Sequence, residues 1–362
     1  MRYLELVKAA LWGEQAAWPK EETEALLRMN ARQGTGALVY PAVLAQEGLS
    51  DATRAHMKSV CLHAMQQQVK LQHVLEKAWR ALEQADIPAV LLKGASLAAL
   101  YPQMQQRTWG DVDLFVGKAQ YHAACAAMRE ALPEAGAFKE EREHYKHYNI
   151  DVGDVPIELH RVTMGLQHPR DKRCYERIEA YGMAHSEWKT INGLSVRVPE
   201  PTFNVLFVFL HSWEHFIGGT ANVRQLCDLA LLLHRYANEL KTELMEQWLR
   251  QLHLLDVWQI YAYNMTQSLG LPRDESLLST EKVAERAEKM MEELLHGEWA
   301  NGQMDNKRVA QNRWVRKWGT MQERMRSAER IKEFSPAYAR HMNWTTWLHG
   351  IGRLFAKDRK WE

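Results

Sequence analysis

Two aspartates, Asp111 and Asp113, stand two residues apart at the start of an apolar segment, residues 112–116. If that segment is a strand, both side chains point to the same face, with about 6.6 Å between them along the chain. Carboxylate oxygens are the ligands that Mg²⁺ prefers in proteins. The pair therefore predicts a site for divalent cations.

A third carboxylate, Glu158, lies in a second segment of strand character. Residues 147–152 and 155–160 alternate between apolar and polar side chains around a turn-forming Gly-Asp pair, which predicts a hairpin. His160 is two residues beyond Glu158 and shares its face, so we expect it to orient that carboxylate. Two-metal phosphoryl chemistry places its cations roughly 3.5–4 Å apart, and two or three carboxylates suffice when substrate phosphates supply other ligands.

Two other acids of the same hairpin compete with Glu158 for the role of third ligand. Asp154 suits the turn itself, and Asp151 lies across from the second arm. Strand register favours Glu158 over both. Pro156, in the second arm, indicates an edge strand or a bulge.

A phosphate-binding element is predicted just before the aspartates. An apolar run ends at Leu92 and is followed by Lys93-Gly94-Ala95-Ser96, which opens a short helix whose N–H groups could face an anion. Lys93 and Arg107 flank the acids, and both suit a triphosphate and the charge that builds on a leaving pyrophosphate.

These motifs, in this order, resemble the polymerase-beta-like nucleotidyltransferase superfamily, and more closely a bacterial branch usually labelled uncharacterised nucleotidyltransferase. The similarity covers about residues 1–240. The motifs that carry it are Lys93-Gly94-Ala95-Ser96, Tyr101-Pro102, Arg107, Gly110-Asp111-Val112-Asp113, Ile157-Glu158-Leu159-His160 and Arg224-Gln225-Leu226-Cys227-Asp228.

The resemblance implies a role for each matching residue. Gly94 and Ser96 would hold the nucleotide phosphates, although Ala95 separates them where the wider superfamily has the two side by side. Asp111, Asp113 and Glu158 would be the catalytic acids and would bind two Mg²⁺ or Mn²⁺ ions. The substrate would be an NTP, and the acceptors of the superfamily range from antibiotics and sugars to proteins and RNA.

The helices and strands that the sequence predicts around this site indicate an α+β fold. We expect a helical N-terminal segment over residues 1–84, a small mixed-sheet core over 85–200 and an all-helical domain over 201–362. A long helix is predicted from about residue 52 to 84, because two apolar stripes repeat there in steps of three and four. We expect both stripes to be core, namely Leu62, Met65 and Val69, and Leu71, Leu75, Trp79 and Leu82.

Two polar pairs of the C-terminal half repeat at one helical turn. His211 and His215 favour packing or a contact near the nucleotide over metal binding, since no third ligand is visible. Arg224 and Asp228 are interpreted as an intrahelical ion pair, with a role facing the active site as the alternative.

Composition narrows the class of protein. Basic and acidic residues nearly balance, 46 against 45, which gives no general reason to expect nucleic acid or an anionic membrane. The basic segment 307–333 is interpreted as a solvated face, with an RNA or anionic acceptor surface as the alternative, and the tryptophan-rich tail as a packing element. Four scattered cysteines and no long apolar segment favour a reducing, cytoplasmic setting.

The sequence thus predicts a metal-dependent enzyme that moves an NMP group from an NTP to a hydroxyl acceptor, most simply a small molecule. A toxin- or antitoxin-type module that nucleotidylates protein or RNA is one alternative. A catalytically silent nucleotide-binding regulator is the other, but such a protein has less need of three acids at one site.

Overall fold

The computed structural model describes residues 2–44, 46–132, 146–166, 168–296 and 327–342. It confirms the α+β class, with a four-stranded mixed sheet in the order β1-β2-β4-β3. β2 runs parallel to β4, whereas the β1–β2 and β3–β4 pairs are antiparallel. The strands are β1 Val90–Leu91, β2 Val112–Phe115, β3 His147–Val152 and β4 Val155–His160.

The register of the central strands sets the site. Asp113 of β2 pairs with Glu158 of β4, and Asn149 of β3 lies on the other side of Glu158. β4 is therefore a central strand, and the edge position that Pro156 suggested is wrong. The proline is tolerated because the pairing of β2 with β4 begins one residue later, at Ile157, so no β2 ladder needs its missing N–H.

A separate two-stranded hairpin, β5 Glu187–Ile191 and β6 Leu194–Val198, follows the main sheet. β5, the first arm of this hairpin, was not predicted from the sequence. The turn of the hairpin is Asn192-Gly193, and both residues have positive φ, 48° and 80°. That pair is a strong hairpin signal, since type I′ turns need positive φ at both central positions.

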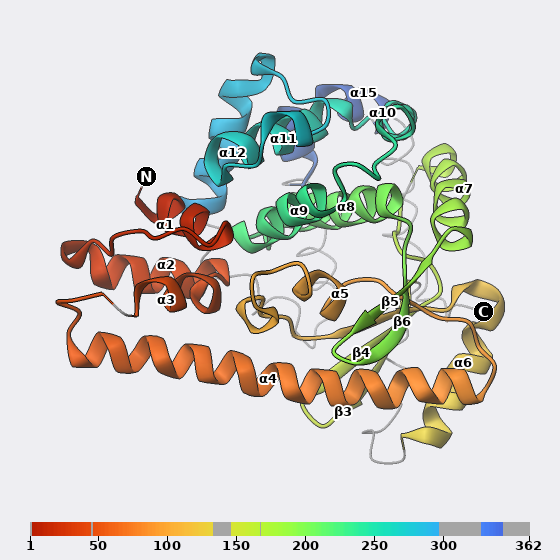
Figure 1. Ribbon diagram of the computed structural model, residues 1–362. Helices are drawn as coiled ribbons and strands as arrows, with labels where there is room; N and C mark the ends of the chain where they lie inside the picture. The colour runs from red at the N-terminus through yellow and green to blue at the C-terminus, as the bar shows by residue number, and fades with distance from the viewer. Residues whose placement is uncertain (1, 45, 133–145, 167, 297–326, 343–362) are drawn as a thin grey trace, which may run out of the picture.

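The helices surround the sheet on several sides. In Figure 1, α4 runs along one edge of the molecule, α8 and α9 cross its middle, and α10 to α12 lie beyond them. The α-helices are α1 Arg2–Leu11, α2 Thr23–Gln33, α3 Gly36–Val43, α4 Asp51–Gln84, α5 Ala95–Ala98, α6 Gly117–Ala131, α7 Pro169–Ala184, α8 Pro201–Gly218, α9 Val223–Tyr236, α10 Thr242–Gln251, α11 Leu255–Leu269, α12 Ala284–His296 and α15 Pro336–Met342.

The buried apolar side chains form two clusters. One joins the sheet to α6 and to the second half of α4. The other joins α1 to α3 with α8 to α12, and α1 packs directly on α11. The N-terminal helices thus share a core with the C-terminal ones, and the domain limits at residues 84 and 200 stay a prediction.

Of the two apolar stripes that were predicted to be buried on the long helix α4, one is buried and the other is exposed. Its second stripe is buried as expected: Leu71, Leu75, Trp79 and Leu82. The prediction for the first stripe is wrong, because Leu62, Met65 and Val69 are 56%, 49% and 70% exposed. The first half of α4 is covered by α3, on the side where Met57 is buried, whereas the second half also faces α6 and the sheet.

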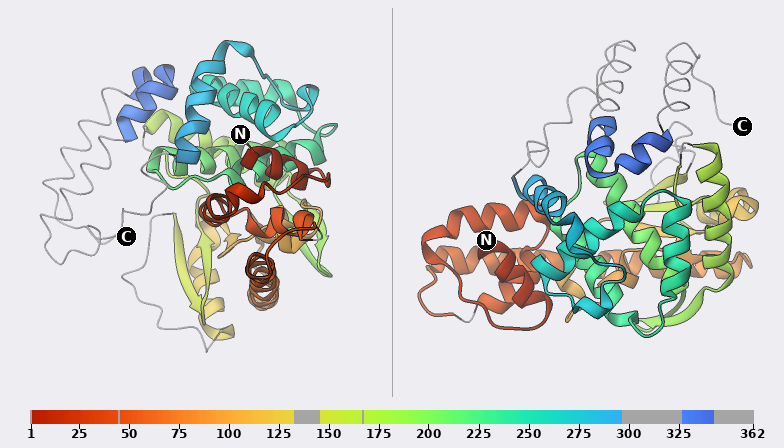
Figure 2. Two further views of the ribbon diagram at one scale, coloured as in Figure 1. Left: turned by 90° about the vertical axis from the view of Figure 1, so that its left-hand side faces the viewer. Right: turned by 90° about the horizontal axis from the view of Figure 1, so that it is seen from above.

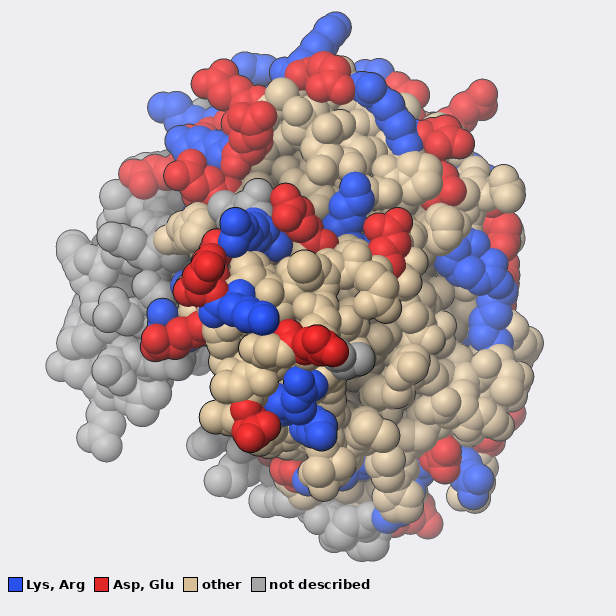
Figure 3. Space-filling view, turned by 60° about the vertical axis from the view of Figure 1, so that its left-hand side comes forward, with Lys and Arg blue, Asp and Glu red and all other residues tan. Residues whose placement is uncertain are grey.

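The surface bears charges of both signs. On the face shown in Figure 3, acidic and basic side chains are interspersed. Among the helices that the structure describes, none combines the length and hydrophobicity that crossing a bilayer requires. The four cysteines are free thiols.

Two sequence predictions fall largely outside the described residues. These are the basic segment 307–333, of which 307–326 is not described, and the tryptophan-rich tail beyond residue 342. Of the part that is described, Arg330 is buried rather than solvated, and it donates to the carbonyl of Phe216 at 2.6 Å.

Candidate functional site

The three acids that the sequence singles out lie together at the sheet. Asp113 is inside β2, Asp111 stands just before that strand, and Glu158 is on the neighbouring parallel strand β4. One carboxylate oxygen of each lies within 4.8 Å of the others. Parallel pairing in register is what brings residues 45 positions apart to the same point.

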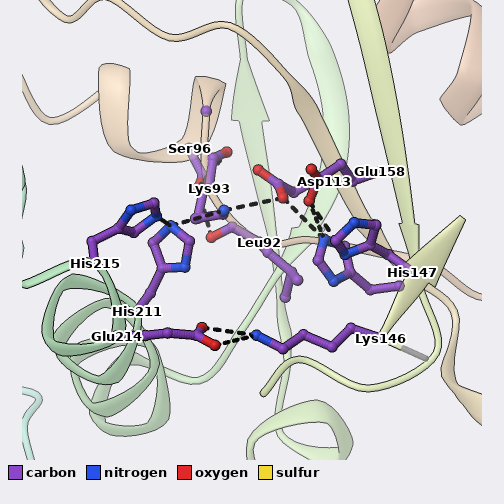
Figure 4. A network of polar contacts seen from close by, with 12 residues as sticks. Leu92, Lys93, Ser96, Asp113, Lys146, His147, Glu158, His211, Glu214 and His215 are labelled. Carbon is purple, nitrogen blue, oxygen red and sulfur yellow. Dashed lines mark hydrogen bonds and ion pairs between the residues drawn. The ribbon is translucent and has the colours of Figure 1, made fainter. Parts of the chain in front are cut away.

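Asp113 is the centre of the polar network drawn in Figure 4 and is fully buried. Its Oδ1 lies 3.1 Å from Nζ of Lys93 and 2.9 Å from Nε2 of His160. Burial alone would raise the pKa of this carboxyl, but Lys93 and His160 outweigh it and lower the pKa. Its Oδ2 is also buried and has no hydrogen-bond partner among the described residues. Such an orphaned anionic oxygen fits a cation ligand.

The pKa of Asp111 is shifted in the opposite direction to that of Asp113. The charge of Asp113, and then burial, raise the pKa of Asp111 to about 6, although Lys93 partly offsets them. Two carboxylates that share a site resist simultaneous ionisation. A bound divalent cation would remove that repulsion and keep both ionised.

Glu158 is held by two histidines. Its Oε2 lies 3.3 Å from Nε2 of His160 and 3.5 Å from Nδ1 of His147. Burial raises the pKa of Glu158, but the hydrogen bond from His160 and the charges of His147 and His160 together outweigh it, so the pKa is lowered. His160 thus contacts Glu158 and Asp113 at once, rather than Glu158 alone. These two acids also raise the pKa of His160 against the effect of burial.

Lys93 lies between the acids and a helix of the C-terminal half. Its buried ammonium is 3.2 Å from Nε2 of His211 on α8, whose ring is 3.2 Å from His215. Burial and then the charge of Lys93 hold the pKa of His211 well below its usual range, so the ring is neutral and can accept from Lys93. The structure therefore places the two histidines beside the predicted phosphate-binding lysine.

Gly94 is required by the backbone and by its surroundings. Its φ is 61°, and a Cβ there would lie 2.5 Å from Cε3 of Trp109. The hydroxyl of Ser96 donates to the carbonyl of Lys93 at 3.3 Å, within its own turn. The role of Gly94 and Ser96 as a phosphate pair stays a prediction.

Arg107 binds an acid of helix α9. Its Nε and Nη2 donate to the two oxygens of Asp228 at 2.6 and 2.8 Å, and Tyr101 donates to the same carboxylate at 2.8 Å. The predicted ion pair of Arg224 with Asp228 is therefore wrong, because Arg224 reaches across to the carbonyl of Thr108 at 2.8 Å instead.

Arg224 and Asp228, both on α9, thus hold the segment that leads to Asp111. Nη1 of Arg107 also donates to the carbonyl of Gly94 at 3.3 Å, so the guanidinium connects the two halves of the site. In this arrangement Arg107 is buried and its donors are engaged by protein groups.

Three site residues were missed from the sequence. His147 stands opposite His160 in the β3–β4 register, so its position beside the site could have been predicted from the expected hairpin. Lys146 and Glu214 form an ion pair, 2.6 Å, that connects the start of β3 to α8 below the histidines (Figure 4). No local pattern joins these two, since they are 68 residues apart.

Comparison with known proteins gives one match. The model of a family described as "Uncharacterised nucleotidyltransferase" matches residues 19–270, which include all the site residues described above. No curated protein and no solved structure matches the chain. Because the matched region is well over half of the sequence, the chain belongs to this family of uncharacterised nucleotidyltransferases.

Proposed function

We propose that this nucleotidyltransferase moves an NMP group from an NTP to a hydroxyl acceptor and releases pyrophosphate. One observation carries the proposal: Asp111, Asp113 and Glu158 bring carboxylate oxygens within 4.8 Å of one another, on adjacent parallel strands. The unpartnered Oδ2 of Asp113 adds to it. These three residues would hold two Mg²⁺ or Mn²⁺ ions.

The reaction exchanges one P–O bond for another. The acceptor oxygen bonds to the α-phosphorus of the NTP, and the bond from that phosphorus to the bridging oxygen of pyrophosphate breaks. The bound cations would supply stabilisation of the negative charge on the attacking and leaving oxygens. The hydroxyl proton passes to a carboxylate of the site, for which we favour Glu158, because its lowered pKa keeps it ionised and able to accept, and because His160 and His147 restrain its orientation.

The other residues act by position and charge. Lys93 would exchange part of its contact with Asp113 for the triphosphate, since its ammonium already lies at the site. Gly94 and Ser96 would receive the phosphates. Arg107 is buried against Asp228, so we assign it to holding the segment before Asp111, and a direct phosphate contact would require it to leave that pair.

The proposal is tested by metal-dependent NTP binding and turnover. Purified protein is mixed with each NTP and Mg²⁺ or Mn²⁺, and its melting temperature is recorded. Labelled NTP with cell extract then shows whether label moves to small molecules, protein or RNA. Glu158→Gln is expected to lose both the metal-dependent stabilisation and the label transfer.

Asp151→Asn is the matched control, because Asp151 lies on β3 one pair further along the same hairpin face. It is expected to behave as the wild type. If both variants lose stabilisation and label transfer equally, or if Glu158→Gln transfers label like the wild type, Glu158 has no specific role in the site. If no NTP shifts the melting of the wild-type protein with either metal, the enzymatic proposal fails. Binding without transfer to any acceptor would favour the silent regulator.

A further inference from the structure

A second group of metal-ligating side chains lies outside the site described above. His168, Asp171 and His341 place one ligand atom each within 4.8 Å of the other two. His168 is the residue that precedes α7, Asp171 is in the first turn of α7, and His341 is near the end of α15. In Figure 1, α15 lies at the top of the molecule and α7 at its right-hand side, and the hydrogen bond between His341 and Asp171 joins the two helices. The nucleotidyltransferase proposal gives this group no role.

The distances fit a metal-bound geometry with little movement. Nε2 of His341 lies 2.8 Å from Oδ1 of Asp171, and Nδ1 of His168 lies 3.6 Å from the same oxygen. Ligands about 2.0–2.1 Å from a tetrahedral ion are about 3.3–3.4 Å from one another. The two observed separations lie on either side of that value.

Two polar atoms of the group are buried and unsatisfied. The side chain of Asp171 is 3% exposed, and its Oδ2 has no hydrogen-bond partner among the described residues. The same holds for Nδ1 of His168, whose side chain is 11% exposed. A buried polar atom without a partner destabilises the fold, so its presence calls for a ligand. A cation bound by the carboxylate of Asp171 and by Nδ1 of His168 would supply the missing partner.

We propose that His168, Asp171 and His341 form a binding site for a zinc-type transition metal ion. Imidazole nitrogens with one carboxylate suit Zn²⁺, Co²⁺ or Ni²⁺, whereas Mg²⁺ takes oxygen ligands. The fourth position falls to solvent, and the ring of His253 lies against His341, tilted by 30° with 4.0 Å between centroids. The chemistry of this site therefore differs from that of the three carboxylates.

The ion would have a structural role. It would fix α15 to α7, two segments 170 residues apart in the sequence. α7 is in turn tied to the chain just after β4, because Glu179 accepts hydrogen bonds at 2.6 Å from both the backbone N–H and the hydroxyl of Thr163. Metal binding is thus expected to stabilise the fold without taking part in nucleotidyl transfer.

The test uses the full-length protein after removal of metals with a chelator. Zn²⁺ is titrated by calorimetry, and Co²⁺ is added to record its visible absorption, which reports nitrogen and oxygen ligands in low coordination. The variants are His168→Gln, the double variant His168→Gln/His341→Gln and the control His185→Gln, a histidine just after the other end of the same helix. Glu158→Gln separates this site from the carboxylate site.

We expect one Zn²⁺ equivalent that Glu158→Gln and His185→Gln retain. His168→Gln should bind it at least tenfold more weakly, and the double variant should lose both it and the intense cobalt absorption. Zn²⁺ should raise the melting temperature of the wild type and not that of the double variant. Unchanged zinc stoichiometry in the double variant, or zinc bound only at the site that Glu158→Gln removes, would overturn the proposal.

Discussion

Replacing Asp111 with Asn should stabilise the metal-free protein while it removes metal binding. The charge of Asp113 and burial raise the pKa of Asp111 from 3.8 to about 6. The ionised carboxylate is therefore less favourable in the folded protein than in the unfolded chain. The difference corresponds to about 3 kcal/mol above pH 6, at 1.36 kcal/mol for each pKa unit.

The sign of the pH dependence follows from the raised pKa. Well below pH 3.8, Asp111 is protonated in both states and has no effect on stability. As the pH rises from 4 to 6, the unfolded chain releases the proton before the folded protein does, so the folded state loses stability, and the loss is complete above pH 6. Asn cannot ionise, so the variant does not undergo this loss of stability. Asp111→Asn should thus be more stable than the wild type at pH 8 by up to about 3 kcal/mol, and nearly equal to it at pH 4.

The assay is urea unfolding in EDTA at pH 4, 6 and 8, with Asp151→Asn as the control for removing an acid from the same region. Saturating Mg²⁺ should reverse the order at pH 8, because a cation stabilises the wild type through Asp111 and has less to bind in the variant. An Asn variant that is less stable than the wild type at pH 8 in EDTA, or a gain that is the same at all three pH values, would refute the reasoning.

Two further substitutions test how the site is supported. Asp228→Asn should cost about 3–5 kcal/mol in urea unfolding, since it leaves Arg107 buried without its partner, whereas Arg235→Gln, at an exposed pair of the same helix, should change stability by less than about 1 kcal/mol. Gly94→Ala should destabilise the fold by more than Gly153→Ala, because φ is similar, 61° and 63°, but only Gly94 is crowded, by Trp109. Equal costs within either comparison would contradict the contacts on which it rests.

Much of the sheet could be predicted because its signals are local. Alternating side chains around a Gly-Asp turn located β3 and β4, and a step of two residues placed Asp111 and Asp113 together. The meeting of these two aspartates with Glu158 depends on one added condition, the parallel pairing of β2 with β4, which the sequence did not predict and the register shows.

What could not be predicted depends on contacts between distant segments. Periodicity showed that Leu62, Met65 and Val69 form a stripe on α4, but not that nothing in the described chain covers it. Arg224 and Asp228 have the spacing of an ion pair, yet each finds a stronger partner in the segment 101–108. A helical spacing says only which side chains are neighbours on a helix. An intrahelical ion pair contributes only tenths of a kcal/mol, so a contact with a buried guanidinium or carbonyl from another segment outweighs it.

The two aspartates differ because, among the described residues, only Asp113 has cationic partners within ion-pair distance. Asp113 is inside β2, where Lys93 and His160 reach the same oxygen, so it stays ionised without a metal. Asp111 is one step outside the strand and meets chiefly the charge of Asp113. In the proposed mechanism, Lys93 would keep Asp113 ready to bind a cation, and that cation would offset the repulsion that raises the pKa of Asp111. On this proposal, metal binding rather than folding would be the event that completes the site.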